Sequence, residues 1–570
     1  MFVRVKSTPN SPRRSVQVVE SSRVGERVSQ RIVRHIGIAL DESEEAKLRS
    51  MAQEFIEREL AQRLNAESLF AVEAVRRAPG RPRRQTLESV APPEDVRLSD
   101  LVEVSRRVEG PHEVLGHLFD YLHFDRVLDG RGSAMLRDLV IARVMAPASK
   151  RGSAAELDQH YGRSHSLDSL YRLMDSLHER LDVLKQIVLE ATTSLVGGAV
   201  QMMLFDVTTL YFESVDADEL RAFGYSKDQK YHCTQVVLAL ATDADGLPIG
   251  YELFAGNTAE VKTLLACMQR WQHSLKIDKV SFVADRALCS RANLSALEAA
   301  PWPYVVAMPL RRSLKAAQQA LVLGTALAAP TEIEGELVWT REFDWEGRRL
   351  IVSYSSKRAH KDRADRQALV QRLQAKLGKS NAPRLDKRTG EIKPPKANAA
   401  KLISNSGYLR YVEQSDAGGV FVLDEDKIDA DAAWDGLHAI VTNDRQASAA
   451  DLLGRYRRLW VIEESFRTLK HSLAVRPIYH FKPERIAAHL GLCYLAFALT
   501  RHAQQRIKLA QQAMSVERIR AALHGVQASI LEHKRTHAKY RLPSVFGHDA
   551  ARIYKAFGLK RELAPSVDLG

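Results

Sequence analysis

Between residues 200 and 309, strand-like and helix-like segments follow one another in an order that few folds accommodate. Three alternating or apolar runs come first, at 200–212, 234–242 and 247–254, and the turn TDADG separates the last two. A helix-like segment, a strand, a second helix and a fifth strand follow, at 261–275, 278–285, 290–300 and 304–309. Strands joined by short turns pair antiparallel, whereas strand-helix-strand units place their strands parallel. The sequence therefore predicts an α/β fold with a mixed sheet flanked by helices.

A single aspartate, Asp206, interrupts the first apolar run, MMLFDVTTLYF, and has no cationic neighbour for several residues on either side. An unpaired carboxylate is rarely buried, because removing its charge from water costs several kcal/mol. A second aspartate, Asp285, ends the fourth strand, DKVSFVAD. In a mixed sheet of this order the first and fourth strands can be neighbours. We therefore expect the two aspartates to lie side by side.

A third acid lies on a late segment, Tyr456 to Leu473, which is expected to form one helix. At about 100° per residue, its apolar residues form one stripe: Leu459, Ile462, Phe466, Leu469 and Leu473. A separate stripe holds an acid, two bases and a phenol: Tyr456, Glu463, Arg467 and Lys470. An ordinary solvated face with a Glu463–Arg467 ion pair explains this helix alone. Combined with two aspartates that end strands, the acid indicates instead a surface that handles phosphate.

Three converging carboxylates, Asp206, Asp285 and Glu463, repel one another unless a cation neutralises them. Oxygen ligands without a nearby His or Cys favour Mg²⁺ or Mn²⁺. Two such ions about 4 Å apart catalyse phosphodiester displacement. We therefore expect two ions, held by carboxylates within metal-bridging distance of one another.

The composition indicates an ordinary globular protein that attracts polyanions. The 570 residues carry a formal net charge of +13, and 45% of them are hydrophobic. A positive field of this kind favours nucleic acid as the partner. The four cysteines form no CxxC pair, and the longest apolar run, LGLCYLAFAL, is far too short to span a membrane. We expect a cytoplasmic location, at the nucleoid, and no membrane partner.

The remaining segments suggest six regions. Residues 1–95 are expected to hold a basic β-hairpin, a charged helix from Asp41 to about Arg77, and a linker containing GRPRR. That motif is similar to an AT-hook, but its short length favours a solvated Pro/Arg linker. Residues 96–198 are expected to be a helical, DNA-binding region. The catalytic core is expected at 199–309 and 446–510, a β-rich insertion with a basic loop at 310–445, and a helical region at 511–570.

The core with Asp, Asp and Glu in these places resembles the RNase H-like catalytic domain of DDE transposases. The Glu helix resembles the signature of the IS-four superfamily of insertion-sequence transposases: Tyr, two residues, Arg, three residues, Glu, six residues, Lys. Tyr456, Glu463 and Lys470 fit that spacing. The Arg does not, because position 459 is Leu, so its phosphate role passes to Arg457, Arg458 or Arg467. The blocks LFDVTTLYFES, FVADRALCS and RLWVIEESFRTLKHSLAVRPIYHF resemble the long branch of these transposases.

The resemblance implies a two-step reaction. Water cuts at the transposon end to free a 3′-hydroxyl, and that hydroxyl then attacks target DNA. It also implies metal ligands at Asp206, Asp285 and Glu463, and DNA-backbone contacts from four residues: Tyr456, Arg458, Arg467 and Lys470. The expected partners are the terminal inverted repeats, target DNA and a second copy of the chain.

Two alternatives share the same residues. A metal-dependent nuclease on this fold would hydrolyse DNA without joining it, and an inactive derivative would bind DNA only. The intact Asp206, Asp285 and Glu463 argue against the inactive derivative. The sequence leaves open the repeat that is recognised, the target preference and the route by which the donor is released.

Overall fold

The computed structural model describes two compact units, Met1–Pro92 and Pro93–Gly570. The described residues are 2–7, 14–24, 27–39, the positions 45, 49, 52, 53 and 56, then 96–196, 200–212, 216–224, 232–274, 280–300, 302–380, 384–385, 391–393, 410–414 and 421–568. The regions 96–198, 199–309, 310–445, 446–510 and 511–570, expected from the sequence, group together in the second unit.

The first unit holds a three-stranded antiparallel sheet rather than the expected hairpin. Its strands are β1 (Phe2–Ser7), β2 (Arg14–Val24) and β3 (Arg27–Ala39), with β2 in the centre. The strand beyond the expected hairpin is β1, whose sequence FVRVKS alternates apolar and basic residues as the other two strands do. Of the helix expected from Asp41, the described positions are helical; its other residues and the GRPRR segment lie outside the described residues.

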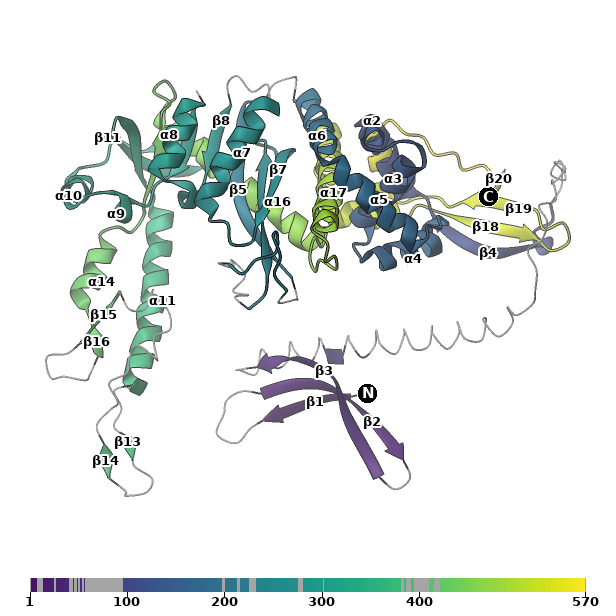
Figure 1. Cartoon of the computed structure of the whole chain (residues 1–570), viewed down its shortest axis with the longest axis horizontal. Helices are drawn as coiled ribbons and strands as arrows, with labels where there is room; N and C mark the ends of the chain where they lie inside the picture. The colour runs from purple at the N-terminus through teal and green to yellow at the C-terminus, as the bar shows by residue number, and fades with distance from the viewer. Residues whose placement is uncertain are drawn as a thin grey trace. The chain divides into compact units, whose positions relative to one another are not determined.

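The second unit is built on a nine-stranded mixed sheet (Figure 1). Five of its strands are those expected from the sequence: β5 (Met202–Tyr211), β6 (Gln235–Thr242), β7 (Pro248–Ala255), β8 (Ser281–Ala284) and β9 (Tyr304–Ala307). They lie in the order β7-β6-β5-β8-β9, with β5, β8 and β9 parallel and β6 and β7 antiparallel to their neighbours. The prediction that the first and fourth strands are neighbours is confirmed.

The β-rich insertion extends this same sheet. Strand β9 pairs with β17 (Leu437–Thr442), which pairs in turn with β12 (Arg348–Tyr354), β11 (Glu336–Trp345) and β10 (Thr331–Ile333). An edge strand presents unpaired backbone groups, and β17 satisfies those of β9. The short helices α9 (Leu310–Ser313) and α10 (Ala316–Gly324) precede these strands.

Between β12 and β17 the chain forms a projection that we call the α11 arm, residues 356–436. It contains the long helix α11 (Ser356–Ser380), the strand pairs β13–β14 (Arg384–Leu385 with Ile392–Lys393) and β15–β16 (Val412–Gln414 with Phe421–Leu423), and helix α14 (Glu425–Ala432). A small hydrophobic cluster that includes Leu373, Leu377 and Tyr411 packs inside it. Figure 1 shows these elements extending together from the large sheet.

Helices cover both faces of the sheet because alternate residues of its strands are buried on opposite sides. Phe205 and Phe282 belong to the cluster beneath α7 (Glu260–Ser274) and α8 (Arg291–Ala299). Leu204 and Val283 belong to the other cluster, with α15 (Ala449–Arg457), α16 (Trp460–Arg467) and α17 (Pro483–Ala510). The LGLCYLAFAL run lies in α17 and is buried, as expected for a core helix.

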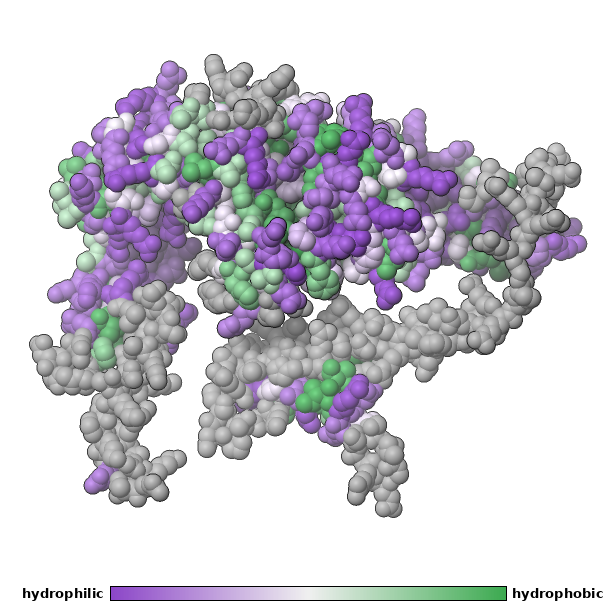
Figure 2. Space-filling model, viewed as in Figure 1, coloured by the Kyte–Doolittle hydropathy of each residue, from purple (hydrophilic) through white to green (hydrophobic). Residues whose placement is uncertain are grey.

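Hydrophilic side chains cover most of the described surface visible in Figure 2.

The hydrophobic cluster that contains Leu204 and Val283 also includes residues of the region at 96–198. This region is mainly helical, as expected, with α2 (His117–Tyr121), α3 (Gly130–Met145), α4 (Lys150–Tyr161), α5 (Leu167–Glu179) and α6 (Leu181–Leu195). Among the described residues, no helix is both long and apolar enough to cross a membrane.

The C-terminal region at 511–570 differs from the all-helical expectation. Besides α18 (Val516–His524) and α19 (His548–Ala556), it contains β18 (Gln527–His533), β19 (Lys539–Pro543) and β20 (Ser566–Val567). These three strands form a four-stranded sheet with β4 (Leu101–Val108), in the order β20-β19-β18-β4. The partner strand lies more than 400 residues earlier in the sequence, so local patterning could not indicate it.

Candidate active site

Asp206 lies on β5 and Asp285 directly follows the neighbouring parallel strand β8, at equivalent positions in the register. The register pairs Phe205 of β5 with Ala284 of β8, and each aspartate is the next residue. Side chains alternate between the two faces of a sheet, so both aspartates belong to the face that carries Leu204 and Val283. The Oδ1 atom of Asp206 accepts a 2.7 Å hydrogen bond from the backbone N–H of Val207. The topology therefore brings two carboxylates to one face of the sheet. The expectation that both aspartates end strands holds for Asp285 alone, because β5 continues past Asp206 to Tyr211 beside β6.

Glu463 comes to the same face on α16. Ile462 and Phe466 of this helix are buried in the same hydrophobic cluster as Leu204 and Val283, so α16 packs over the strands that carry the aspartates. Glu463 itself is exposed in the first turn of the helix. It follows Ile462 by one residue, about 100° around the helix, and so lies at the rim of the packed face. Its neighbour Glu464 makes an ion pair, with Arg501 at 3.5 Å.

The expected single helix from Tyr456 to Leu473 is interrupted. Helix α15 ends at Arg457, α16 begins at Trp460, and a π-helical turn, η5 (Thr468–Ser472), follows. Between the two helices, hydrogen bonds join residues three apart, as from the N–H of Leu459 to the carbonyl of Tyr456. Such bonds tighten the turn relative to an α-helix. Tyr456 and Glu463 therefore lie on different helices, although the predicted apolar stripe is buried throughout.

Tyr456 contacts one of the acids. Its phenol donates a hydrogen bond to Oδ1 of Asp285 at 3.3 Å, longer than the usual O–H···O distance of about 2.7–2.8 Å. The ring of Tyr456 also packs against the imidazole of His438, with their centroids 4.8 Å apart. Burial, and then the charge of Asp285, raise the pKa of the phenol, so it remains a proton donor at neutral pH. The structure thus places Tyr456 where it orients Asp285.

Three residues of this neighbourhood were missed from the sequence: His438, Arg286 and Arg358. Burial, and then the positive charges of Arg358 and Arg286, lower the pKa of His438 to about 3, so the imidazole is neutral. Arg286 directly follows Asp285 and is exposed, so its adjacency in FVADRALCS was an available signal. His438 and Arg358 come from β17 and α11, and no local pattern connects them with the aspartates.

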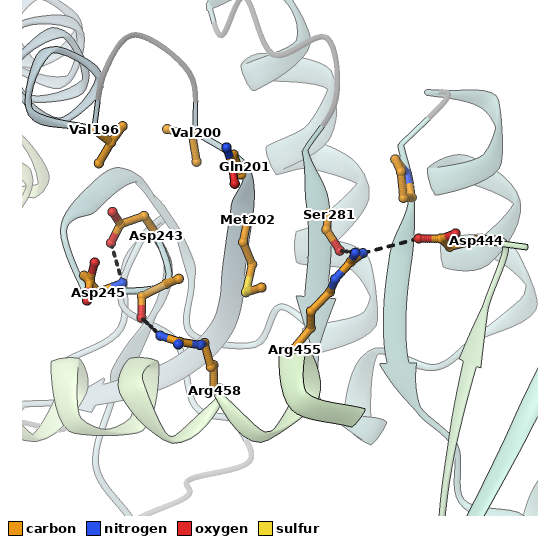
Figure 3. A pocket seen from close by; sticks show the side chains of 12 residues that line it. Val196, Val200, Gln201, Met202, Asp243, Asp245, Ser281, Asp444, Arg455 and Arg458 are labelled. Carbon is orange, nitrogen blue, oxygen red and sulfur yellow. Dashed lines mark hydrogen bonds and ion pairs between the residues drawn. The ribbon is translucent and has the colours of Figure 1, made fainter. Parts of the chain in front are cut away.

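Arg458 lies at the other end of the strands. Its guanidinium reaches the carbonyl of Ala244, in the turn between β6 and β7, at 3.5 Å. That turn borders a cavity of about 760 Å³ beside Met202 and Ser281, the first residues of β5 and β8 (Figure 3). Four residues of strand, about 13 Å at about 3.3 Å per residue, separate Met202 from Asp206. The structure does not bring Arg458 to the three acids.

The aspartates of this cavity already have partners. Asp243 accepts hydrogen bonds from the backbone N–H groups of Asp245 and Leu247, which fixes the turn. Asp444 pairs with Arg455 at 3.3 Å, and Figure 3 shows Arg455 between it and Ser281. The cavity therefore lies at the edge of the sheet where β5 and β8 begin, and its residues Asp243 and Asp444 serve the structure of that edge.

Arg467 and Lys470 continue from Glu463 along the chain. Arg467 is exposed at the end of α16, and Lys470 is half-buried in η5. Among the ion pairs of the described residues, none joins Glu463 to Arg467, so the alternative of a simple paired surface face has no support. π-helical turns occur frequently at functional sites.

The carboxylates fit a divalent metal in their chemistry. Asp206, Asp285 and Glu463 offer only oxygen donors, which hard cations such as Mg²⁺ prefer. Within the described residues, however, no three acidic, His or Cys side chains gather closely enough to hold an ion, so the expected convergence within bridging distance is not present. Of the three acids, Asp206 and Asp285 are half-buried and Glu463 is exposed.

A five-stranded sheet in the order β7-β6-β5-β8-β9, with acids on its central parallel pair, defines an RNase H-like domain. The comparisons with known proteins make the class specific. The family model described as "Transposase DDE domain" matches residues 201–499, just over half of the chain. The chain belongs to this family, whose members are DNA transposases.

Among solved structures, the chain is similar to the piggyBac transposase synaptic complex with hairpin DNA, with a TM-score of 0.34 and 10% identity, over 73% of this chain and 77% of that one. No curated protein matches the chain.

Proposed function

We propose that this chain is the transposase of an insertion sequence, which cleaves DNA at the ends of its element and joins them to target DNA in a metal-dependent reaction. The observation that carries the proposal is the register that makes Asp206 and Asp285 neighbours on parallel strands, with the helix of Glu463 packed over them. These three residues are the proposed catalytic residues and ligands of Mg²⁺ or Mn²⁺. Two such ions, when bound, activate the attacking oxygen and stabilise the leaving one.

The proposed reaction consists of two nucleophilic displacements at phosphorus. In the first, a water oxygen attacks the phosphorus at the element's end, the bond from phosphorus to the 3′-oxygen breaks, and that oxygen takes a proton. In the second, this 3′-hydroxyl loses its proton and its oxygen attacks a phosphorus of target DNA. One phosphodiester bond forms, the bond from that phosphorus to the target's 3′-oxygen breaks, and the released oxygen takes a proton. Both steps depend on positioning and charge neutralisation rather than on a covalent enzyme intermediate.

The chain's own residues supply the positioning. Tyr456 orients Asp285 through its phenol. The exposed Arg286, which directly follows Asp285, is the proposed cation that neutralises the scissile phosphate. Arg467 and Lys470 are the proposed contacts to the DNA backbone, and a dimer assembled on two ends is the proposed active form.

The test is a joining assay. The DNA that flanks the gene supplies the candidate ends, which are labelled and incubated with a target plasmid and Mg²⁺. We expect 3′-hydroxyl ends and joined products from the wild type. We expect neither from Asp206→Asn, Asp285→Asn or Glu463→Gln, each of which should still bind the ends in a mobility-shift assay.

Two results would change the assignment. Cleavage without joined products, with both ends present, would support a nuclease. Normal cleavage by any of the three variants would show that the residue is not part of the site.

A further inference from the structure

We propose that the exposed basic face of α11 binds the phosphate backbone of the DNA that enters the candidate active site. This inference rests on the proposed function, and it assigns a DNA-binding surface to the α11 arm.

The arm begins at the edge of the sheet that carries the aspartates. Strand β17 is antiparallel to β9 and to β12, so β12 runs parallel to β9, β8 and β5. Parallel strands end at the same edge of a sheet. Strand β12 ends at Tyr354, shortly before α11 begins. This end therefore lies on the same edge of the sheet as the end of β8, which Asp285 follows.

Contacts connect the start of the arm with the acids. Tyr354 and Ser353 of β12 pair with Leu437 and His438 of β17. His438 packs on Tyr456, and Tyr456 donates to Asp285. Arg358, in the first turn of α11, also acts electrostatically on both His438 and Tyr456. The first turn of α11 therefore lies close to the residues that surround Asp285.

The outward face of α11 is basic over most of its length. Lys357, Lys361 and Arg372 are exposed and fall within an arc of about 60° at about 100° per residue. They span about 22 Å of helix at about 1.5 Å per residue, a length over which duplex DNA presents about a dozen charges. Figure 2 shows the described surface of α11 and α14 as mainly hydrophilic.

Two of the arginines on the other sides of the helix have acidic partners. Arg366 forms a two-pronged ion pair with Asp435, and Arg358 lies 3.7 Å from Asp362. In the described part of the chain, no ion pair is formed by Lys357, Lys361 or Arg372, and the exposed acid Asp365 is the exception on an otherwise cationic flank. An exposed helix face whose cations form no ion pairs attracts a polyanion such as DNA.

The experiment compares two triple variants in an Asp206→Asn background, which removes cleavage. The arm variant carries Lys357→Gln, Lys361→Gln and Arg372→Gln. The matched control carries Arg535→Gln, Lys555→Gln and Lys560→Gln, which remove the same charge from exposed positions outside the arm. Glutamine preserves helix propensity, so circular dichroism should show unchanged helicity.

Binding is measured by fluorescence anisotropy at several salt concentrations, with a duplex of the element's end and an unrelated duplex of equal length. For the arm variant we expect about tenfold weaker binding or more. We also expect the slope of log K against log salt to fall by about 2 to 3, at about 0.9 per phosphate contact, for both duplexes. The control should bind as the parent does, and so should a Lys357→Arg, Lys361→Arg variant.

An unchanged slope, an equal loss in the control, or a loss confined to one duplex would each overturn the proposal. Failure of the proposed function is a separate result, because it would appear as cleavage by the Asp206→Asn protein and not in the binding slopes.

Discussion

The phenol of Tyr456 donates a hydrogen bond to the carboxylate of Asp285, so helix α15 orients the acid that follows strand β8. Tyr456→Phe removes this bond but keeps the ring on His438. Since partners that orient a metal ligand typically contribute 10- to 100-fold to activity or metal affinity, and this bond is long, we expect about a tenfold loss of cleavage rate. Higher Mg²⁺ should restore part of it, and DNA affinity should be unchanged. A loss of affinity at constant rate would instead make the phenol a direct backbone contact.

Mg²⁺ should stabilise the folded protein. An ion that binds only the native state at ten times its Kd adds about 1.4 kcal/mol to the free energy of unfolding. We therefore expect Mg²⁺ to raise the midpoint of thermal unfolding of the wild type, and a chelator to reverse the rise. Asp206→Asn, which removes one proposed ligand, should show a clearly smaller rise. Equal shifts in the two proteins would place the ion elsewhere.

Gly436, at the base of the α11 arm, should not tolerate a side chain. Its φ is +79°, and an added Cβ would lie 2.6 Å from the ring of Tyr354 and 2.8 Å from Ala359. Gly436→Ala is therefore expected to lower the free energy of unfolding by about 1–3 kcal/mol, as overpacking does. In helix α15, Gly454 faces open space, so Gly454→Ala should instead stabilise the protein by about 0.5–1 kcal/mol. Urea unfolding measures both, and equal effects would contradict the steric argument.

Lys150 should make stability depend on pH above neutrality. It is buried, 3.3 Å from Nδ1 of His489, and burial together with the charge of Arg143 lowers its pKa to about 7. Between pH 7 and about pH 10 the unfolded chain, with a lysine pKa of about 10.4, binds more protons than the folded one. The free energy of unfolding therefore gains up to about 1.4 kcal/mol per pH unit as pH rises through this window.

The variant Lys150→Met removes that titration. The difference in stability between wild type and variant should then rise from pH 7 to pH 9 in favour of the wild type. Parallel stability curves over this range would mean that Lys150 does not titrate in the window.

The sequence was sufficient to predict the central sheet, because each of its strands carries its own pattern. The hairpin-linked runs and the two strand-helix-strand units allow β5 and β8 to be neighbours, and the structure confirms that they are, with Asp206 and Asp285 each following a paired residue. The buried stripe of Ile462 and Phe466 was equally readable from helical periodicity.

Other features depend on contacts between distant segments. The break between α15 and α16 is hidden in the sequence because Leu459, which lies in the break, keeps the helical spacing of the apolar residues that follow it. The addition of β17 to β9, and the packing of His438 on Tyr456, join residues that no local pattern relates. The role of Tyr456 toward Asp285 was missed for the same reason.

The pairing of Tyr354 with Leu437 means that the chain leaves the sheet and returns to it at a single register position. In topological terms the 82 residues between them (437 − 354 − 1) are the loop of a β-hairpin. The entropy of closing such a loop changes only slowly with its length, by about 0.6 kcal/mol per doubling. The length of the arm can therefore vary at little cost to the pairing of the strands that carry the acids, so the reach of its DNA-binding face can change while the sheet is preserved.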